Sequence, residues 1–340
     1  MIDDPTCPVC SLSCWREIGS RRYSRPAESK GSHYVNQRLG VLFDVWLPGQ
    51  SSVEVRAVLC EACGMVIQRP RPEAADLDAK YHYLRDRQAA VPASATGSAR
   101  VVASAISVER GAEMQRAISR LAGRRIRDLN VLDYGGGDGQ LMQPFLQANC
   151  HCDLVDYAPH QLAGVRKIGD TLASVPADRR YDLVIASHVV EHLADPLAVV
   201  ASLAERLASG GLLYVEVPME IWGQPPLQAE PVTHINFFSR SSLRCLLETA
   251  GLQVLDCQLA SSRHPSGRRF AAVKAVATQG SPGARPPLPG PAEVERLLSP
   301  HPLRRLQAAA SSPRVVVSAL RYRVRSALAG GRQPMGVPLP

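Results

Sequence analysis

The chain has 340 residues, of which 45% are hydrophobic and 21% charged, a composition that suits a globular protein with room for two domains. No apolar run approaches the roughly 18 residues of a membrane span, and the N-terminus lacks the basic and apolar sections of a signal peptide, so we expect a cytoplasmic protein. In that reducing location the nine cysteines are not expected to form a disulfide framework. The net charge is +8, but nine arginines and two glutamates after residue 278 account for +7 of it. The rest of the chain is nearly neutral, which argues against reading the whole protein as a nucleic-acid binder from its charge.

Composition divides the chain into regions. Residues 1–75 contain five of the nine cysteines and few helical signals, whereas helical and strand patterns alternate up to residue 278. Residues 280–291 are rich in Pro and Gly, so neither helix nor strand is expected to persist there. We therefore expect a zinc-ribbon-like module at 1–75, a connecting segment at 76–103, an α/β domain at 104–278, and a linker with a basic tail at 279–340.

The α/β domain is expected to be an open, mostly parallel sheet, because strands and helices alternate with short connections. The apolar run DLVIAS is typical of a parallel strand that is covered on both faces. Asp195-Pro196 is a helix start with a capping Asp and a Pro in the first turn, and Ser239 is a second cap. The expected elements, in chain order, are a helix at 104–122, a strand at 130–134, a helix at 140–148, strands at 152–156 and 182–187, a helix from 195 to about 208, a strand at 212–217, a helix from 239 to 250, and strands at 253–259 and 269–278.

Residues 131–139, VLDYGGGDG, place four glycines directly behind the first expected strand. Glycine allows backbone to approach a ligand closely, and ligands of such sheets lie at the carboxyl ends of the strands. The dinucleotide spacing G-x-G-x-x-G fails in both registers. The spacing that fits is D-x-G-x-G-x-G, formed by Asp133, Gly135, Gly137 and Gly139. Asp156, at the end of the next strand, can accept both hydroxyl protons of a ribose.

These features resemble a class I S-adenosylmethionine-dependent methyltransferase over about residues 105–278. The segments YDLVIASHVVEHLADP (181–196), SGGLLYVEVP (209–218) and HINFFSRSSLRCLLETAGL (234–252) carry the rest of the likeness. The resemblance implies a Rossmann-like sheet of seven strands with one antiparallel edge strand and helices on both faces. It also implies that Asp133 and the three glycines hold the methionine end of S-adenosylmethionine, that Asp156 holds its ribose, and that Asp170 meets its adenine amino group. The spacing between Asp156 and Asp182 implies a shortened third strand.

Methyl transfer needs an aligned nucleophile and, for a hydroxyl, removal of its proton. The candidates beyond the fourth and fifth strands are His188, Glu191, His192 and His234. Glu191 and His192 can instead pin the loop and cap the next helix. His234 is the main candidate for a general base, or else it anchors the turn at Phe237 and Phe238.

Two C-x-x-C pairs, Cys7 with Cys10 and Cys60 with Cys63, supply the four thiolates of a tetrahedral zinc site. Redox pairs or buried free cysteines are the alternatives. The long spacer between the pairs implies an insertion. The order CPVC … LCEACG resembles the zinc-ribbon N-terminus of methyltransferases that act in sugar and cell-surface glycan pathways, where the module helps to cover the substrate.

The functional expectation is methyl transfer to a small-molecule or glycan acceptor, a sugar or sugar nucleotide. An RNA methyltransferase and a non-catalytic cofactor-binding protein are the alternatives, and the sparse Lys and Arg of the cysteine region disfavour RNA. Residues 313–329 are basic and amphipathic; such a tail either contacts an anionic membrane or an acidic partner, or lies on the protein's own body or in solvent.

Overall fold

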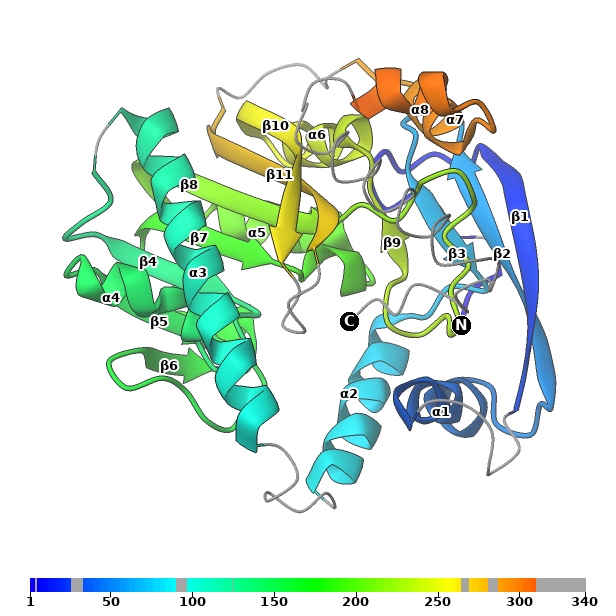
Figure 1. The fold of residues 1–340 in the computed structure, drawn as a ribbon, viewed down its shortest axis with the longest axis horizontal. Coiled ribbons are helices and arrows are strands. Elements are labelled where there is room, and N and C mark those ends of the chain that lie inside the picture. Colours follow the sequence, from blue (N-terminus) through cyan, green and yellow to red (C-terminus); the bar gives the residue numbers. More distant parts are fainter. Residues whose placement is uncertain are drawn as a thin grey trace.

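The computed structural model describes residues 1–3, 5–25, 33–89, 97–123, 125–263, 269–280 and 287–309. It contains two sheets that lie side by side (Figure 1), a seven-stranded sheet from the middle of the chain and a four-stranded sheet that is mainly N-terminal. Helices α7 and α8 lie at one end of the junction between the two sheets, and helix α2 lies at the other end.

The larger sheet has the strand order β10-β11-β8-β7-β4-β5-β6. Strands β4 to β8 are mutually parallel, and β11 is antiparallel to both of its neighbours. The expected seven-stranded sheet with one antiparallel strand is therefore confirmed, but the expected edge position of that strand is wrong, because β11 lies between β10 and β8. Its strands are β4 (Asn130–Tyr134), β5 (His151–Val155), β6 (Arg166–Gly169), β7 (Tyr181–Ser187), β8 (Leu207–Pro218), β10 (Leu252–Arg263) and β11 (Arg269–Gln279).

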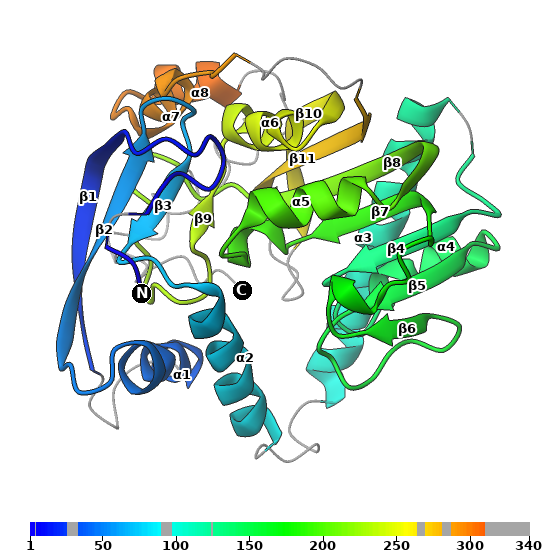
Figure 2. The ribbon, with the colours of Figure 1, turned by 180° about the vertical axis from the view of Figure 1, so that it is seen from behind.

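Helices cover both faces of this sheet: α3 lies over the face seen in Figure 1, and α5 and α6 lie over the opposite face in Figure 2. Because successive strand residues point to opposite faces, Leu183 and Ile185 pack on the α3 side, while Val184 and Ala186 pack on the α5 and α6 side. The helices are α3 (Gly97–Ala122), α4 (Gln143–Gln147), α5 (Pro196–Ala204) and α6 (Arg240–Thr249). Single turns of 3₁₀-helix occupy Gln140–Met142, Leu172–Ser174 and Val190–His192.

The smaller sheet is antiparallel with the order β1-β2-β3-β9. Its strands are β1 (Trp15–Ser24), β2 (Ser52–Cys60), β3 (Val66–Arg69) and β9 (Asn236–Phe237). The first three precede the larger sheet in the chain, but β9 comes from the segment between β8 and α6. That segment therefore joins the two sheets, and the buried residues of β3, β9 and α6 belong to one continuous core.

Three helices flank the small sheet, namely α1 (His33–Gly40), a π-helix at Val41–Trp46, and α2 (Ala74–Ala89). Helix α1 and the π-helix, together with β1 and β2, form the insertion that the long spacer between the cysteine pairs implies. The sequence does not predict α1 and the π-helix, because this stretch shows few helical signals. Residues 74–89 and 97–122 are helical, so the whole described part of the connecting segment 76–103 is helix.

The local predictions are right for most elements of the larger sheet. Asp195 caps α5 by accepting a hydrogen bond from Ala198 N, and Ser239 caps α6 in the same way from Ser242 N. The expected end of the first of these helices at Ala208 is wrong, because α5 ends at Ala204 and β8 already begins at Leu207. The third strand, β6, is four residues long and no α-helix lies between it and β5, as the short spacing implies.

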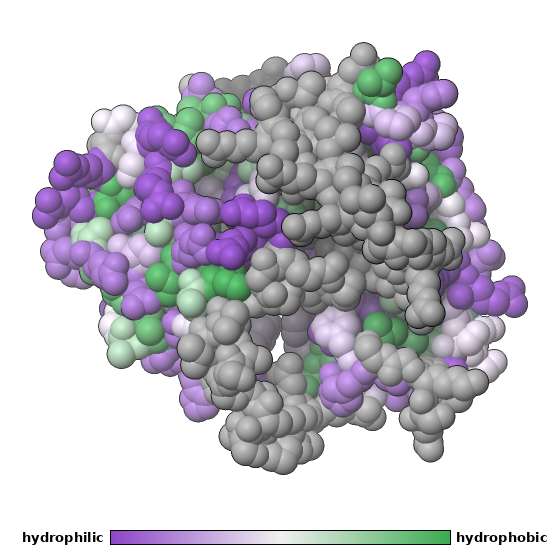
Figure 3. Space-filling model, viewed as in Figure 1, coloured by the Kyte–Doolittle hydropathy of each residue, from purple (hydrophilic) through white to green (hydrophobic). Residues whose placement is uncertain are grey.

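After the Pro/Gly-rich stretch the chain forms two further helices, α7 (Ala292–Leu298) and α8 (Pro302–Ala309). Glu293 accepts hydrogen bonds from Arg240 Nε and Ser241 N at the start of α6, so α7 is fixed to the body. The amphipathic segment 313–329 lies outside the described residues. None of the helices in the described part of the chain combines the length and apolar character that a membrane crossing requires. Among the coloured residues of Figure 3, hydrophilic and hydrophobic side chains are interspersed.

Candidate active site

The glycine loop follows β4 at the carboxyl edge of the large sheet. Gly135, Gly137 and Gly139 all have positive φ, of 72°, 62° and 77°. A Cβ at Gly135 would lie 2.5 Å from Cγ2 of Val189, and one at Gly136 would overlap the Asp133 carboxylate. A side chain at either position is therefore excluded by packing, and the first also by backbone conformation. The loop leaves its backbone open to a cavity.

Asp133 lies under this loop and is 1% exposed. Neither of its carboxylate oxygens has a hydrogen-bond partner among the described residues. Burial, with a smaller contribution from the negative charge of Asp156, raises the pKa of Asp133 to about 7. A buried carboxylate without a donor is costly in a protein core, so its retention beside a cavity points to a cationic or donor ligand.

Asp156 begins the loop after β5. One of its oxygens accepts a hydrogen bond from Gly137 N at 2.9 Å, and the other accepts one from Ala158 N at 2.7 Å. The structure thus brings Asp156 to the glycine loop. Asp170 lies apart from this contact: it pairs with Lys167 at 2.7 Å, and its side chain is half exposed. Tyr157, next to Asp156, stacks on Tyr81 of α2 with 5.7 Å between ring centroids.

His188 directly follows β7 and has φ of 59°, a left-handed conformation that is unusual for a non-glycine residue. Its Nδ1 donates to Glu191 Oε1 at 3.2 Å, and its Nε2 lies 3.4 Å from Glu216 Oε1. Burial disfavours the charged imidazole, but the two glutamates outweigh burial and raise the pKa of His188 to about 8. Glu216 also contacts Arg110 at 3.4 Å and Lys274 at 3.5 Å. His188 is therefore held inside a network of buried charges.

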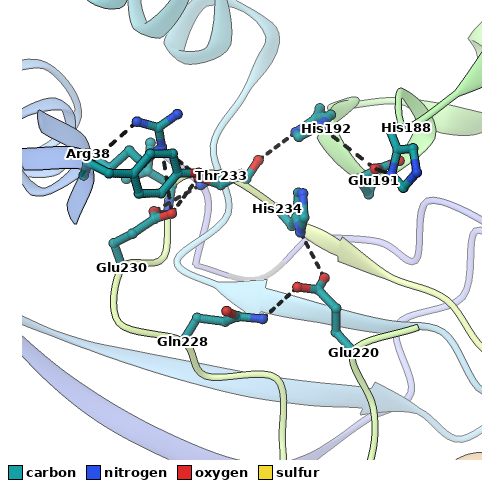
Figure 4. A network of polar contacts seen from close by, with 11 residues as sticks. Arg38, His188, Glu191, His192, Glu220, Gln228, Glu230, Thr233 and His234 are labelled. Carbon is teal, nitrogen blue, oxygen red and sulfur yellow. Dashed lines mark hydrogen bonds and ion pairs between the residues drawn. The ribbon is translucent and has the colours of Figure 1, made fainter. Parts of the chain in front are cut away.

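His192 and His234 lie next to each other, with 4.8 Å between ring centroids (Figure 4). His192 Nδ1 is 2.6 Å from Thr233 O, and His234 Nδ1 is 2.9 Å from Glu220 Oε2. Burial lowers the pKa of His192 to about 3. Burial also disfavours charge on His234, but the neighbouring Glu220 carboxylate outweighs it and raises the pKa of that histidine.

The loop that carries His234 is held by the N-terminal module. Thr233 Oγ1 lies 2.9 Å from both Tyr34 OH and Arg38 Nε, and it also contacts Glu230. Lys80 of α2 is 3% exposed and donates to Val232 O at 3.2 Å. Burial lowers the pKa of Lys80 to about 8. The segment before His234 thus takes its position from α1 and α2.

One cavity of about 410 Å³ joins these groups. Asp133 and Gly135 to Gly137 line one end, and Tyr34, Arg38, Thr233 and His234 line the other. The groups between and around them include Ser107, Arg110, Asp138, Gln140, Ser187, His188, Glu191, His192, Arg263 and Phe270. The structure therefore brings together Asp133, two of the three predicted glycines and all four predicted acceptor-site residues, whereas Gly139, Asp156 and Asp170 do not line the cavity.

The four cysteines of the two C-x-x-C pairs also come together. Their sulfur atoms all lie within 4.8 Å of one another, with Cys7 and Cys63 at 3.5 Å and Cys10 and Cys60 at 3.6 Å. Four thiolates bound to one zinc ion at about 2.3 Å lie about 3.8 Å apart, so the cluster has the dimensions of such a site. Cys14 lies close by, with 3.7 Å between its sulfur and that of Cys60.

Several site residues have no counterpart in the sequence-based prediction. Glu220, Tyr34, Arg38 and Lys80 lie in segments without a recognisable motif. Arg110 projects from α3 to Ser187 and Glu216. Only the buried setting of Glu220 beside His234 identifies it, because an isolated Glu in a loop carries no sequence signal.

The strand order, the glycine loop and the acidic residue after β5 define a class I methyltransferase domain. In agreement, residues 108–256 match a family model described as a methyltransferase domain.

Among curated proteins, the chain is similar to ubiquinone biosynthesis O-methyltransferases. That of Cereibacter sphaeroides is 32% identical over 120 residues, which is 32% of this chain and 48% of the relative. That of Xanthomonas campestris is 26% identical over 152 residues, 37% of this chain and 63% of the relative. The match to the first of these spans about half of the relative's length.

Among solved structures, similar chains include the 1,6-didemethyltoxoflavin-N1-methyltransferase of Burkholderia thailandensis, with 18% identity and a TM-score of 0.41, covering 64% of this chain and 96% of that one. The glycopeptide N-methyltransferase MtfA is 17% identical with a TM-score of 0.38, covering 50% of this chain and 90% of that one.

Proposed function

We propose that the protein is an S-adenosylmethionine-dependent methyltransferase whose acceptor is a polar small molecule, a sugar or sugar nucleotide. The observation that carries this proposal is one continuous cavity that runs from the glycine loop and Asp133 to Glu191, His192 and His234. The Asp133 carboxylate has no hydrogen-bond partner among the described residues. A methyl donor and a proton-bearing acceptor have to meet in such a space.

S-adenosylmethionine fits the residues at the glycine end. The Asp133 carboxylate would accept from the ammonium group of the methionine moiety, which removes the cost of its burial. The positive-φ glycines leave room for the methionine chain, and Asp156 would accept from the ribose hydroxyls. When bound, the cofactor supplies an electrophilic methyl group on a sulfonium. The protein's own groups orient the acceptor and accept or release its proton.

The acceptor end favours a hydroxylated substrate. Tyr34, Arg38 and Thr233 offer hydroxyl and guanidinium groups there, and His188, Glu191, His192 and His234 add imidazole and carboxylate groups. A sugar has many hydroxyls and little apolar surface, so this lining is complementary to it. The match to O-methyltransferases among the curated relatives is consistent with a hydroxyl acceptor.

We further propose that Cys7, Cys10, Cys60 and Cys63 bind zinc and stabilise the N-terminal module. These four cysteines are buried, and their sulfur atoms lie within 4.8 Å of one another. Thiolates at this spacing satisfy the tetrahedral preference of Zn²⁺.

Calorimetric titration of S-adenosylhomocysteine tests the cofactor proposal. The parent protein should bind it, and Asp156→Ala should weaken binding by about tenfold or more through loss of the ribose contact. Asp178→Ala, on an exposed loop at the opposite edge of the sheet, is the matched control and should bind like the parent. Lack of binding to the parent would refute the proposal. Incubation with S-adenosylmethionine and a panel of sugars and sugar nucleotides, with S-adenosylhomocysteine release as the readout, then identifies the acceptor.

A further inference from the structure

Three side chains at the acceptor end of the cavity form a group with the donor set of a metal site. Glu191, His192 and His234 each offer one ligand atom within 4.8 Å of the other two. They come from two segments that lie far apart in the sequence, the turn after β7 and the loop before β9. Glu191 and His234 are buried, and His192 is about one-fifth exposed.

Within the described residues each histidine uses its Nδ1 in a hydrogen bond, which leaves Nε2 for an ion. His192 Nδ1 faces the carbonyl oxygen of Thr233, and a carbonyl only accepts, so this Nδ1 carries the proton. His234 Nδ1 faces the Glu220 carboxylate and carries its proton for the same reason. A histidine whose other ring nitrogen donates to a carbonyl or a carboxylate is the usual arrangement of a metal ligand, because that bond fixes the ring and its tautomer.

Glu191 supplies the third donor. Its Oε1 accepts from His188 Nδ1 and lies 3.8 Å from His192 Nε2, while its Oε2 is buried and has no hydrogen-bond partner among the described residues. A metal ion beside Oε2 would remove the cost of that unpartnered oxygen. The nearby cations do not take its place, because Lys80 donates to Val232 O and Arg38 to Thr233 Oγ1.

We propose that Glu191, His192 and His234 bind one divalent transition-metal ion at the acceptor end of the cavity. Two imidazoles and one carboxylate with open coordination positions suit Mn²⁺, Fe²⁺ or Co²⁺. Ligand atoms 2.0–2.2 Å from one ion lie at most about 4.4 Å apart. The observed spread of 4.8 Å therefore closes with a shift of a few tenths of an ångström.

This inference rests on the proposed function and deepens it, because the three ligands line the cavity in which the acceptor would bind. An acceptor hydroxyl bound to the ion would release its proton to water more readily. Its oxygen would then bond to the methyl carbon as the carbon–sulfur bond of the sulfonium breaks, leaving the neutral thioether. The role of His234 changes accordingly: its single Nε2 lone pair holds the ion and is not free to accept the proton.

Titration with Mn²⁺, followed by the electron paramagnetic resonance signal of the free ion, tests the site. The protein is used with its zinc content measured beforehand, so that the cysteine cluster is accounted for. We expect the parent to bind about one Mn²⁺ per chain. His192→Gln and His234→Gln should each bind it at least about tenfold more weakly. The control is His151→Gln, which replaces the first residue of β5 and should bind Mn²⁺ like the parent.

Binding of S-adenosylhomocysteine, measured in the same samples, separates loss of the ion from loss of the fold and from failure of the proposed function. Retained cofactor binding without any Mn²⁺ or Co²⁺ uptake by the parent would overturn the metal site and leave His234 as a candidate proton acceptor. Uptake that both variants retain would also overturn it, because the ion would then lie elsewhere.

Discussion

At Asp133, stability and ligand binding are expected to oppose each other. Its folded-state pKa of about 7 lies well above the usual value of a carboxyl. A raised acid pKa means that the unfolded chain releases this proton first, so the contribution to stability falls as pH rises from about 4 to about 7. Asp133→Asn should therefore raise the melting temperature of the ligand-free protein at pH 8, measured by calorimetry. A variant with a lower melting temperature would contradict this.

The same substitution should weaken cofactor binding. Between pH 6 and pH 8 the parent should bind S-adenosylhomocysteine about tenfold more tightly as Asp133 ionises, since the ionised carboxylate pairs with the ammonium group. The groups that act on this carboxyl are Asp156, which raises its pKa, and Arg110, which lowers it. Asp133→Asn should show weak binding with little pH dependence, and Asp178→Asn should follow the parent. If binding by Asp133→Asn still depended steeply on pH, another titrating group would be responsible for the pH dependence.

His234 and Glu220 act as a pair, with His234 at the cavity and Glu220 behind it. Replacing His234 by Ala should lower turnover at least about tenfold, because the acceptor loses its activating group, while binding of S-adenosylhomocysteine stays within about twofold. Glu220→Gln should cause a smaller loss, since an amide oxygen still accepts from Nδ1. Rates of S-adenosylhomocysteine release with an accepted acceptor provide the measurement. Unchanged turnover in His234→Ala would remove this residue from the reaction.

Among the elements, β9 connects the two sheets, and Arg71 fixes this connection. Arg71 is 4% exposed and donates to Ile235 O, Leu193 O, Ala194 O and Asn236 Oδ1. One guanidinium from the end of the N-terminal sheet thus serves four acceptors in the segments around the histidines, of which Leu193 O also accepts from Asn236 Nδ2. No other residue type offers donors in that geometry.

Arg71→Met should therefore destabilise the protein by about 3 kcal/mol or more, because it leaves several buried carbonyls without donors. Chemical denaturation gives this free energy of unfolding. The control is Arg56→Met, an exposed arginine of β2, for which a change within about 0.5 kcal/mol is expected. A similarly small effect at Arg71 would mean that water replaces the lost donors.

The individual helices and strands also show how much of the structure the sequence predicts. Hydrophobic runs, the caps at Asp195 and Ser239, and the glycine spacing predict the large sheet and its ligand edge, because those signals are local. The two-residue pairing of β3 with β9 has no local signal in the sequence, because strands β4 to β8 lie between them in the chain. The contacts of His234 with Glu220, and of its loop with α1 and α2, follow from that pairing and are not predictable from local patterns.

The end of α5 shows tertiary structure overriding a local preference. Residues 205–208 begin with Glu, Arg and Leu, which all favour helix by intrinsic propensity, so the sequence predicts that the helix continues to Ala208. The structure instead pairs Leu207 with Tyr181, so that β8 begins there beside β7. Pairing between strands from separate segments decides this boundary, and a local pattern does not contain it.

For the molecule as a whole, the cysteine cluster is expected to control the acceptor end of the cavity more than the cofactor end. The cluster includes Cys60 and Cys63 at the turn between β2 and β3, β3 pairs with β9, and β9 begins two residues after His234. The glycine loop and Asp156, by contrast, depend on β4 and β5 of the large sheet. A Cys7→Ser/Cys10→Ser double variant should lose its zinc and lower the melting temperature, because a structural metal site contributes directly to folding free energy.

In that variant, methyl transfer should fall at least about tenfold while S-adenosylhomocysteine binding stays within about threefold, since only the acceptor loop loses its support. Metal analysis, calorimetric titration and product release are measured on the same preparation. Cys257→Ser, a partly buried cysteine of β10 outside the cluster, should retain zinc and both activities. Equal loss of binding and turnover would show that the module supports the whole fold, and full turnover without zinc would show that the acceptor site does not depend on it.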